Sequence, residues 1–174
     1  MPAPEVPIAL VGMMAAGKTV VGMELARLLG RRFADTDALI AAAAGAPVHT
    51  LFAREGEAGF RAREQALAAE LGRYPGYVLA LGGGMFVGEE MVNLIRRQAR
   101  TIWLQATVQT LGARLDAAGT AERPMLQGGE RAARLAQLLA ERTPWYAQAD
   151  LTVATDGLTP AAVARAIAQA LGSA

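Results

Sequence analysis

The chain has 174 residues, a length that suits one domain with a sizeable core, and 53% of its residues are hydrophobic. Its formal net charge of +1 gives no electrostatic reason to expect nucleic acid or an acidic membrane surface as a partner. It contains no cysteine, which excludes disulfides and thiolate metal sites, and no uninterrupted apolar run as long as a membrane span. We therefore expect a cytoplasmic protein with no membrane or nucleic-acid partner, and we expect it to act as a monomer.

The first functional signature lies in a turn between a predicted strand and a predicted helix. Residues 6–11 form a short apolar run typical of a buried strand, and residues 20–29 repeat apolar side chains at helical spacing. Between them stands Gly12-Met13-Met14-Ala15-Ala16-Gly17-Lys18-Thr19, which matches G-x-x-x-x-G-K-[ST], the phosphate-binding P-loop. A plain glycine-rich turn is the alternative, but the flanking strand and helix favour the P-loop.

A P-loop presents backbone N–H groups and the positive end of a helix to a nucleotide's phosphates. Residues 12–19 are therefore the predicted nucleotide-binding residues. Lys18, the only lysine in the chain, is expected to reach the β- and γ-phosphates of ATP. The hydroxyl of Thr19 is expected to ligate Mg²⁺.

Two carboxylates follow the second predicted strand, residues 31–35. Asp35 and Asp37 project to the same side if the extended conformation continues, and the carboxyl ends of parallel strands face the ligand crevice. The alternative is a structural role, with Thr36 or Asp37 as the N-cap of a helix over residues 38–44. Both interpretations stay open on these residues alone.

Further along, two more patterns carry both a structural and a functional interpretation. Helices are predicted over residues 48–54 and from residue 56 to about 71, and Arg61 and Glu64 share a face of the second. Their spacing favours a solvent-side ion pair over an arginine aimed at an anionic substrate. Gly82-Gly83-Gly84 directly follow a predicted strand over residues 77–81, which indicates close approach of substrate or phosphate rather than a flexible connection.

The remaining elements complete an alternation of strands and helices. We predict helices over residues 89–98, 108–117, 130–142 and 159–171, and strands over residues 101–104 and 150–154. Pro144 is expected to bend or end the helix that precedes it. Residues 118–129 predict either a mobile lid that carries Arg123 over a transferring phosphate or a plain surface loop. The pattern indicates an α/β fold with three layers, a five-stranded parallel sheet with helices on both faces, in one domain over residues 1–174.

Taken together in this order, the motifs make the chain resemble shikimate kinase from the first strand to the last helix. They are Gly12–Thr19, Asp35-Thr36-Asp37, Gly56-Glu57 leading to Phe60-Arg61 with Glu64, Gly82-Gly83-Gly84, Arg123-Pro124, and Arg142 with Pro144 and Tyr146. The P-loop is common to many enzymes, whereas the ordered set is specific to this family.

The resemblance implies a P-loop kinase that transfers the γ-phosphate of ATP to the 3-hydroxyl of shikimate, on the route to chorismate, with Mg²⁺. Asp37 would hold and polarise that hydroxyl, while Arg61 and Arg142 would clamp the shikimate carboxylate. The triplet Gly82–Gly84, chiefly Gly83, would contact a ring hydroxyl.

The resemblance also implies supporting roles. Glu64 would orient Arg61, and Asp35 would hold Mg²⁺ through water beside Thr19. Lys18 and Arg123 would act in catalysis, the latter descending with the lid. The substrate-binding helical part would span about residues 37–65.

The chain departs from the family pattern in three places, one of which is Asp156-Gly157-Leu158, where an arginine that some relatives have near the last strand is missing. Ala15 and Ala16 stand where the family often has glycine or serine, and the phosphate cradle is expected to survive if both keep a negative φ. Arg114 lies nine residues before Arg123, farther than the arginine that often stacks on adenine, so we do not expect it to contact the base.

Another small-molecule P-loop kinase, for gluconate or a nucleoside monophosphate, is the alternative enzyme. Such a kinase has no need of Asp37 together with two carboxylate-clamping arginines. A regulatory GTPase is disfavoured because its Asn-Lys-x-Asp motif needs a second lysine. A nucleotide-binding relative without catalysis is the non-enzyme alternative, but every catalytic position implied by the family is filled.

Overall fold

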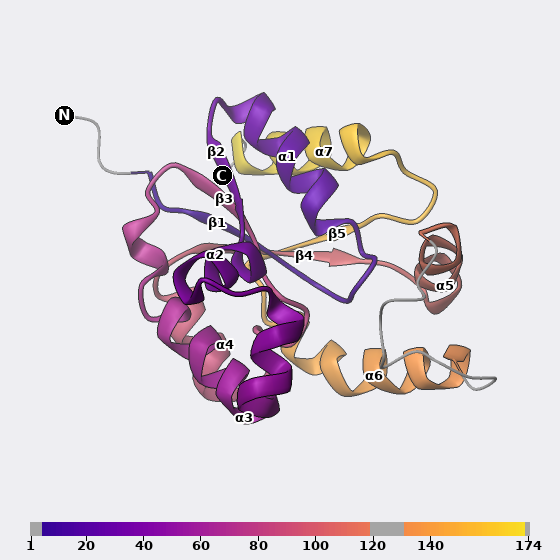
Figure 1. Cartoon of the computed structure of the whole chain (residues 1–174). Helices are drawn as coiled ribbons and strands as arrows, with labels where there is room; N and C mark the ends of the chain where they lie inside the picture. Colours follow the sequence, from indigo (N-terminus) through magenta and orange to yellow (C-terminus); the bar gives the residue numbers. More distant parts are fainter. Residues whose placement is uncertain (1–4, 119–130, 173–174) are drawn as a thin grey trace.

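The computed structural model describes residues 5–118 and 131–172, which form a parallel sheet between two layers of helices (Figure 1). The five strands lie in the order β2-β3-β1-β4-β5. Their bounds are β1 (Ile8–Val11), β2 (Arg32–Asp35), β3 (Tyr77–Ala80), β4 (Arg100–Gln105) and β5 (Leu151–Ala154). All neighbouring strands pair in parallel. The predicted α/β class and five-stranded parallel sheet are confirmed.

The helices are α1 (Lys18–Leu29), α2 (Thr36–Ala44), α3 (Val48–Ala68), α4 (Glu89–Arg96), α5 (Val108–Ala117), α6 (Arg131–Tyr146) and α7 (Pro160–Gly172). A short 3-10 helix spans Leu71–Arg73. Figure 1 shows α1 and α7 side by side on one face of the sheet, with α2, α3, α4 and α6 toward the other. The predicted three layers are therefore present.

The central strand explains where the core lies. All four residues of β1 are buried, with Ile8 the most exposed at 2%. A strand covered by helices on both faces is apolar throughout rather than alternating, as β1 is. β1 pairs with β3 on one side and with β4 on the other, and the chain passes from β3 over β1 to β4. The strand order therefore reverses beside β1, and ligands bind at such a switch point in open α/β sheets.

Three predicted boundaries are wrong, each for a local reason. The N-cap of α2 is Asp35 rather than Thr36 or Asp37, because its side chain accepts a hydrogen bond from the Asp37 backbone N–H. Helix α6 does not end at residue 142. Hydrogen bonding resumes after Pro144, with the N–H of Ala147 donating to the Thr143 carbonyl at 2.9 Å, so the helix continues to Tyr146.

The third difference is in α3, whose second part ends at Ala68 rather than near residue 71, whereas the predicted break between two helices is confirmed. At that break Gly56 adopts φ 68° and ψ −175°, a conformation essentially restricted to glycine. Among the described residues no single helix is long and apolar enough to cross a membrane. The pair α2 and α3 meets the length and composition criterion only when taken together, and it is bent by 93°.

We expect Gly56→Ala to lower the free energy of unfolding by about 1–3 kcal/mol, because alanine has a Cβ that disfavours this backbone conformation. No neighbouring atom lies within 4 Å of a Cβ built there, so the cost is purely conformational. Urea unfolding followed by circular dichroism measures it.

Gly112→Ala in α5 is the matched control. A Cβ at Gly112 also meets nothing within 4 Å, but Gly112 has regular helical geometry. Alanine should therefore stabilise the protein there by about 0.5–1 kcal/mol. Equal effects of the two substitutions would contradict the conformational argument.

Candidate active site

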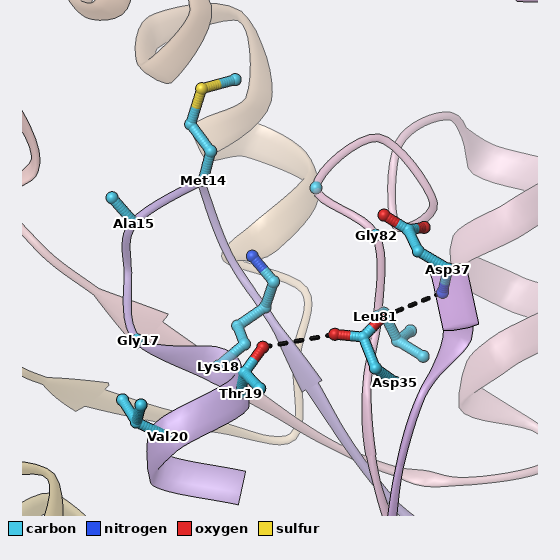
Figure 2. Close-up of a pocket in the computed structure, with 11 residues that line it drawn as sticks. Met14, Ala15, Gly17, Lys18, Thr19, Val20, Asp35, Asp37, Leu81 and Gly82 are labelled. Carbon is cyan, nitrogen blue, oxygen red and sulfur yellow. Dashed lines mark hydrogen bonds between the residues drawn. The ribbon is translucent and has the colours of Figure 1, made fainter. Parts of the chain in front are cut away.

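A cleft of about 250 Å³ lies at the carboxyl edge of the sheet, where three adjacent strands end. The turn after β1 supplies Lys18 and Thr19, the turn after β2 supplies Asp35 and Asp37, and the turn after β3 supplies Gly82. Figure 2 shows the Lys18 ammonium group extending into the space between the first turn and the other two. Since β1 and β2 both pair with β3, these three turns meet without any long excursion of the chain.

The turn after β1 has the shape that the P-loop pattern predicts. Lys18 donates from Nζ to the carbonyls of Gly12 and Met13, both at 2.8 Å. Gly12 has φ 142°, and a Cβ there would lie 2.7 Å from the backbone oxygen of Leu104. Glycine is therefore required at the first position by backbone conformation and by the close approach of β4.

Ala15 departs from expectation. It was expected to keep a negative φ, but its φ is 61°, the one positive value among the described residues other than glycine. The left-handed conformation costs an L-residue about 1–2 kcal/mol. The turn keeps it because the carbonyls of Ala15 and Ala16 both accept hydrogen bonds from Arg114, at 3.3 and 3.1 Å.

Asp35 combines the two roles that the sequence left as alternatives. Its Oδ1 accepts from the backbone N–H of Asp37 and so caps α2, while its Oδ2 accepts from the Thr19 hydroxyl at 3.2 Å (Figure 2). The side chain of Asp37 lines the cleft. By capping α2 at the backbone N–H of Asp37, Asp35 helps to position Asp37 at the cleft.

Oxygen groups that suit Mg²⁺ lie beside the P-loop. The Thr19 hydroxyl and the Asp35 carboxylate are hard oxygen donors in mutual contact. Within residues 5–118 and 131–172 no group of three or more His, Cys, Asp and Glu side chains could hold a metal ion. Mg²⁺ keeps several waters and takes one or two protein ligands together with phosphates, so this donor pair fits it better than a metal that needs a full protein cage.

Thr36 is a site residue that the sequence did not assign. Its side chain is fully buried, and its hydroxyl donates to the carbonyl of Ala80 at 3.2 Å and accepts from the N–H of Gly82 at 3.0 Å. It therefore ties the end of β2 to the start of the glycine triplet. The available signal was its place between Asp35 and Asp37, because alternation along a strand points the middle side chain inward.

The first and last glycines of the triplet lie against charged side chains. A Cβ at Gly82 would stand 2.9 Å from Oδ1 of Asp37 and 3.0 Å from Oε1 of Glu64. A Cβ at Gly84 would stand 2.5–2.8 Å from the guanidinium atoms of Arg61. Glycine at positions 82 and 84 leaves these side chains the room that a Cβ would occupy.

Arg61 pairs with a buried carboxylate, Glu64, rather than forming the fully solvent-side pair that their spacing favoured, and 39% of the Arg61 side chain is exposed. The Glu64 side chain is only 2% exposed, and its Oε2 accepts from Nη1 of Arg61 at 2.5 Å. Burial raises the pKa of Glu64, an effect that Arg61 opposes and the nearby charge of Asp37 reinforces. A second, exposed carboxylate, Glu57, contacts Nη2 of Arg61 at 3.4 Å.

Gly83 connects the triplet to a distant helix. Its carbonyl accepts from the hydroxyl of Tyr146 at 2.5 Å and from Nη1 of Arg142 at 3.3 Å, both from α6. Burial raises the pKa of Tyr146, which keeps the hydroxyl protonated and able to donate. The sequence marked Tyr146 only as part of a motif, since nothing local shows that it reaches residue 83.

The structure describes one of the two remaining arginines, Arg114, but not the other, Arg123. Arg123, and the lid over residues 118–129 apart from Ala118, lie outside the described residues. Arg114, which we did not expect at the nucleotide base, is held against the outer side of the P-loop and donates to the Thr155 carbonyl at 3.0 Å. It lines a small second pocket with Leu158 and Pro160.

We expect Thr36→Val to lower the free energy of unfolding by about 1–3 kcal/mol. Valine has nearly the same shape as threonine, but it leaves the Ala80 carbonyl and the Gly82 N–H without their hydrogen-bond partner. Thr152→Val on an exposed position of β5 is the control and should change stability by less than about 0.5 kcal/mol. Urea unfolding of both variants measures the difference, and equal stabilities would contradict the bridging role of Thr36.

Comparison with known proteins agrees with this geometry. The family model for shikimate kinase matches residues 14–172. The shikimate kinase of Symbiobacterium thermophilum is 46% identical over 142 residues, which is 82% of each chain. The structure of shikimate kinase from Acinetobacter baumannii in complex with shikimate superposes with a TM-score of 0.88 at 35% identity, covering 97% of this chain and 94% of that one.

A gluconokinase from Sinorhizobium meliloti, by contrast, has a TM-score of 0.61 at 15% identity, covering 98% of this chain and 93% of that one, and shares the fold alone. The resemblance inferred from the ordered motifs is confirmed. The chain belongs to the shikimate kinase family and is a kinase.

Proposed function

We propose that the chain transfers the γ-phosphoryl group of ATP to the 3-hydroxyl of shikimate, giving shikimate 3-phosphate and ADP. The observation that carries this proposal is the meeting of the P-loop, Asp37 and the glycine triplet in one cleft, with two arginines converging on the triplet. The relative from A. baumannii holds shikimate, which supports the choice of acceptor.

The P-loop side of the cleft would hold the nucleotide. Backbone N–H groups of the loop would face the phosphates, and the amino end of α1, which begins at Lys18, would add its positive dipole. Lys18, already held close to the loop by two carbonyls, needs only a side-chain rotation to meet the β- and γ-phosphate oxygens. Thr19 and Asp35 would hold Mg²⁺, which neutralises phosphate charge when bound.

The triplet side of the cleft would hold the acceptor. Shikimate carries one carboxylate and three hydroxyls, so it suits guanidinium groups together with a carboxylate that accepts a hydrogen bond. Arg61 and Arg142 approach the triplet from α3 and α6 and would grip the substrate carboxylate. Asp37 would accept the hydrogen bond of the attacking hydroxyl, and Gly83 would contact another ring hydroxyl.

Catalysis on this arrangement depends on positioning. The acceptor oxygen forms a bond to the γ-phosphorus as the bond to the β,γ-bridging oxygen breaks, and ADP leaves with that electron pair. The proton of the acceptor hydroxyl leaves along its hydrogen bond to the Asp37 carboxylate. Asp37 aligns the hydroxyl and Lys18 offsets the charge on the phosphates. Glu64 holds Arg61 by a short contact, which fixes the acceptor relative to the nucleotide.

The organisation of the chain is part of the same proposal. Residues 1–174 would act as one domain, and about residues 37–65 would form its acceptor-binding part. Arg123 and the lid stay predictions, because they lie outside the described residues. The monomeric state and the cytoplasmic location also stay predictions.

The direct test is a coupled ADP-release assay with ATP and Mg²⁺ that compares shikimate with quinate, gluconate and a nucleoside monophosphate. We expect turnover that depends on shikimate. We expect Asp37→Asn to reduce kcat by about 10²- to 10⁴-fold while ATP binding stays near normal. Turnover of gluconate or of a nucleoside monophosphate in place of shikimate would overturn the proposal.

Arg61→Ala tests the carboxylate clamp. The clamp holds ground state and transition state alike, so the loss should appear mainly as a rise in the shikimate KM of roughly 10- to 100-fold, as expected for a lost charge-assisted hydrogen bond. Arg97→Ala, an exposed arginine after α4, is the matched control and should leave both KM values unchanged. An effect of Arg61→Ala confined to the ATP KM would contradict the assignment.

A further inference from the structure

We propose that Glu55 and Arg63 form a brace across the break in α3 and thereby set the direction in which Arg61 meets the acceptor. Both are positioning residues, and the inference rests on the acceptor-binding role proposed above for Arg61. Neither residue belongs to the motif set that implied the function.

The break creates the need for such a brace. Gly56 interrupts the helical geometry of α3, so the part before it and the part after it are joined by one residue with unusual freedom. Glu57, Arg61 and Glu64, which make up the cluster around the Arg61 guanidinium group, all lie in the second part. Any change of angle at Gly56 therefore moves the whole cluster relative to the cleft.

The ionic contact spans that break. Arg63 donates from Nε and Nη2 to the two oxygens of Glu55, both at 2.8 Å, in a bidentate arrangement. The partners are eight residues apart, which corresponds to about 12 Å along a straight helix, whereas ion pairs on a helix face join residues three or four apart. The contact exists because the helix turns at Gly56, and it holds that turn at one angle.

Packing beneath the ion pair shows that it is a built feature. A Cβ at Gly59 would stand 2.5 Å from Cβ of Glu55, so Glu55 lies directly on the backbone of the second part and only glycine leaves room for it. Phe52 and Phe60, also eight residues apart, stack across the same break with ring centroids 4.5 Å apart. An apolar contact and an ionic contact thus close the break together.

The brace stands apart from the reacting groups. Arg63 lines a groove on the opposite side of α3, with Leu39 and Tyr74, whereas Arg61 lines the space beside Gly84. Two residues along a helix differ by about 200° in direction, so Arg61 and Arg63 face opposite ways from one backbone. A change at Arg63 therefore reaches the acceptor only through the angle of the helix.

The test compares Glu55→Gln and Arg63→Gln with the charge swap Glu55→Arg/Arg63→Glu. We expect each single variant to raise the shikimate KM roughly 2- to 10-fold, with kcat and the ATP KM unchanged, and the swap to recover most of the loss. The matched control is Glu70→Gln with Arg73→Gln, an exposed pair at 3.3 Å on the same side of the fold, which should change none of these values.

Hydrogen exchange gives a readout that does not depend on turnover. The backbone amides of residues 57–64 should exchange faster in both single variants than in the unmodified chain, and the control pair should not alter them. If the unmodified chain fails to turn over shikimate, the proposed function fails while this measurement still decides the brace. Unchanged exchange, unchanged shikimate KM, or a folded swap variant that recovers nothing would each overturn the brace.

Discussion

The close approach of side chains to the backbone of Gly82–Gly84 is the constraint on which the rest of the site depends. Asp37 from α2 and Glu64 and Arg61 from α3 lie where Cβ atoms would otherwise be, and Arg142 from α6 reaches the middle glycine. Chain segments far apart in sequence meet on this one stretch. The strand β3 that delivers it sits between β2 and β1, so Gly82 and Gly83 also line the cleft beside the P-loop turn.

Buried hydroxyl groups hold this stretch from both sides. Thr36 bonds to the backbone just before and at the first glycine, and Tyr146 bonds to the carbonyl of the second. Neither hydroxyl needs to touch a ligand to matter, since each satisfies backbone groups that the glycines leave exposed to the interior. Two uncharged hydroxyl groups thus help to hold the acceptor side, together with Arg142, which also donates to the Gly83 carbonyl.

Local pattern was enough to predict the strands and the P-loop, because a short apolar run followed by a glycine-rich turn has few other uses. It was not enough for Arg61 and Glu64, because spacing on a helix face does not tell which side of the molecule that face meets. Only the ordered motif set suggested their role. The contact of Tyr146 with Gly83 joins residues 63 positions apart, so no periodicity within either element could indicate it.

Ala15 shows the same limit at a single residue. The sequence suggested ordinary backbone geometry there, but the turn places this alanine in the left-handed region. The tertiary contact responsible is Arg114, 99 residues away, which binds the Ala15 carbonyl. Propensity was overridden by a partner that the local sequence does not contain.

The hydrogen bonds to the P-loop have a consequence for the thermodynamics of association. Lys18 holds the carbonyls of Gly12 and Met13, and Arg114 holds those of Ala15 and Ala16, so the loop is shaped before any phosphate arrives. A phosphate that binds to a preformed loop restricts few further backbone dihedral angles. The conformational entropy of the loop is therefore lost during folding rather than during binding. Affinity at this turn is thus set by desolvation and charge rather than by chain order.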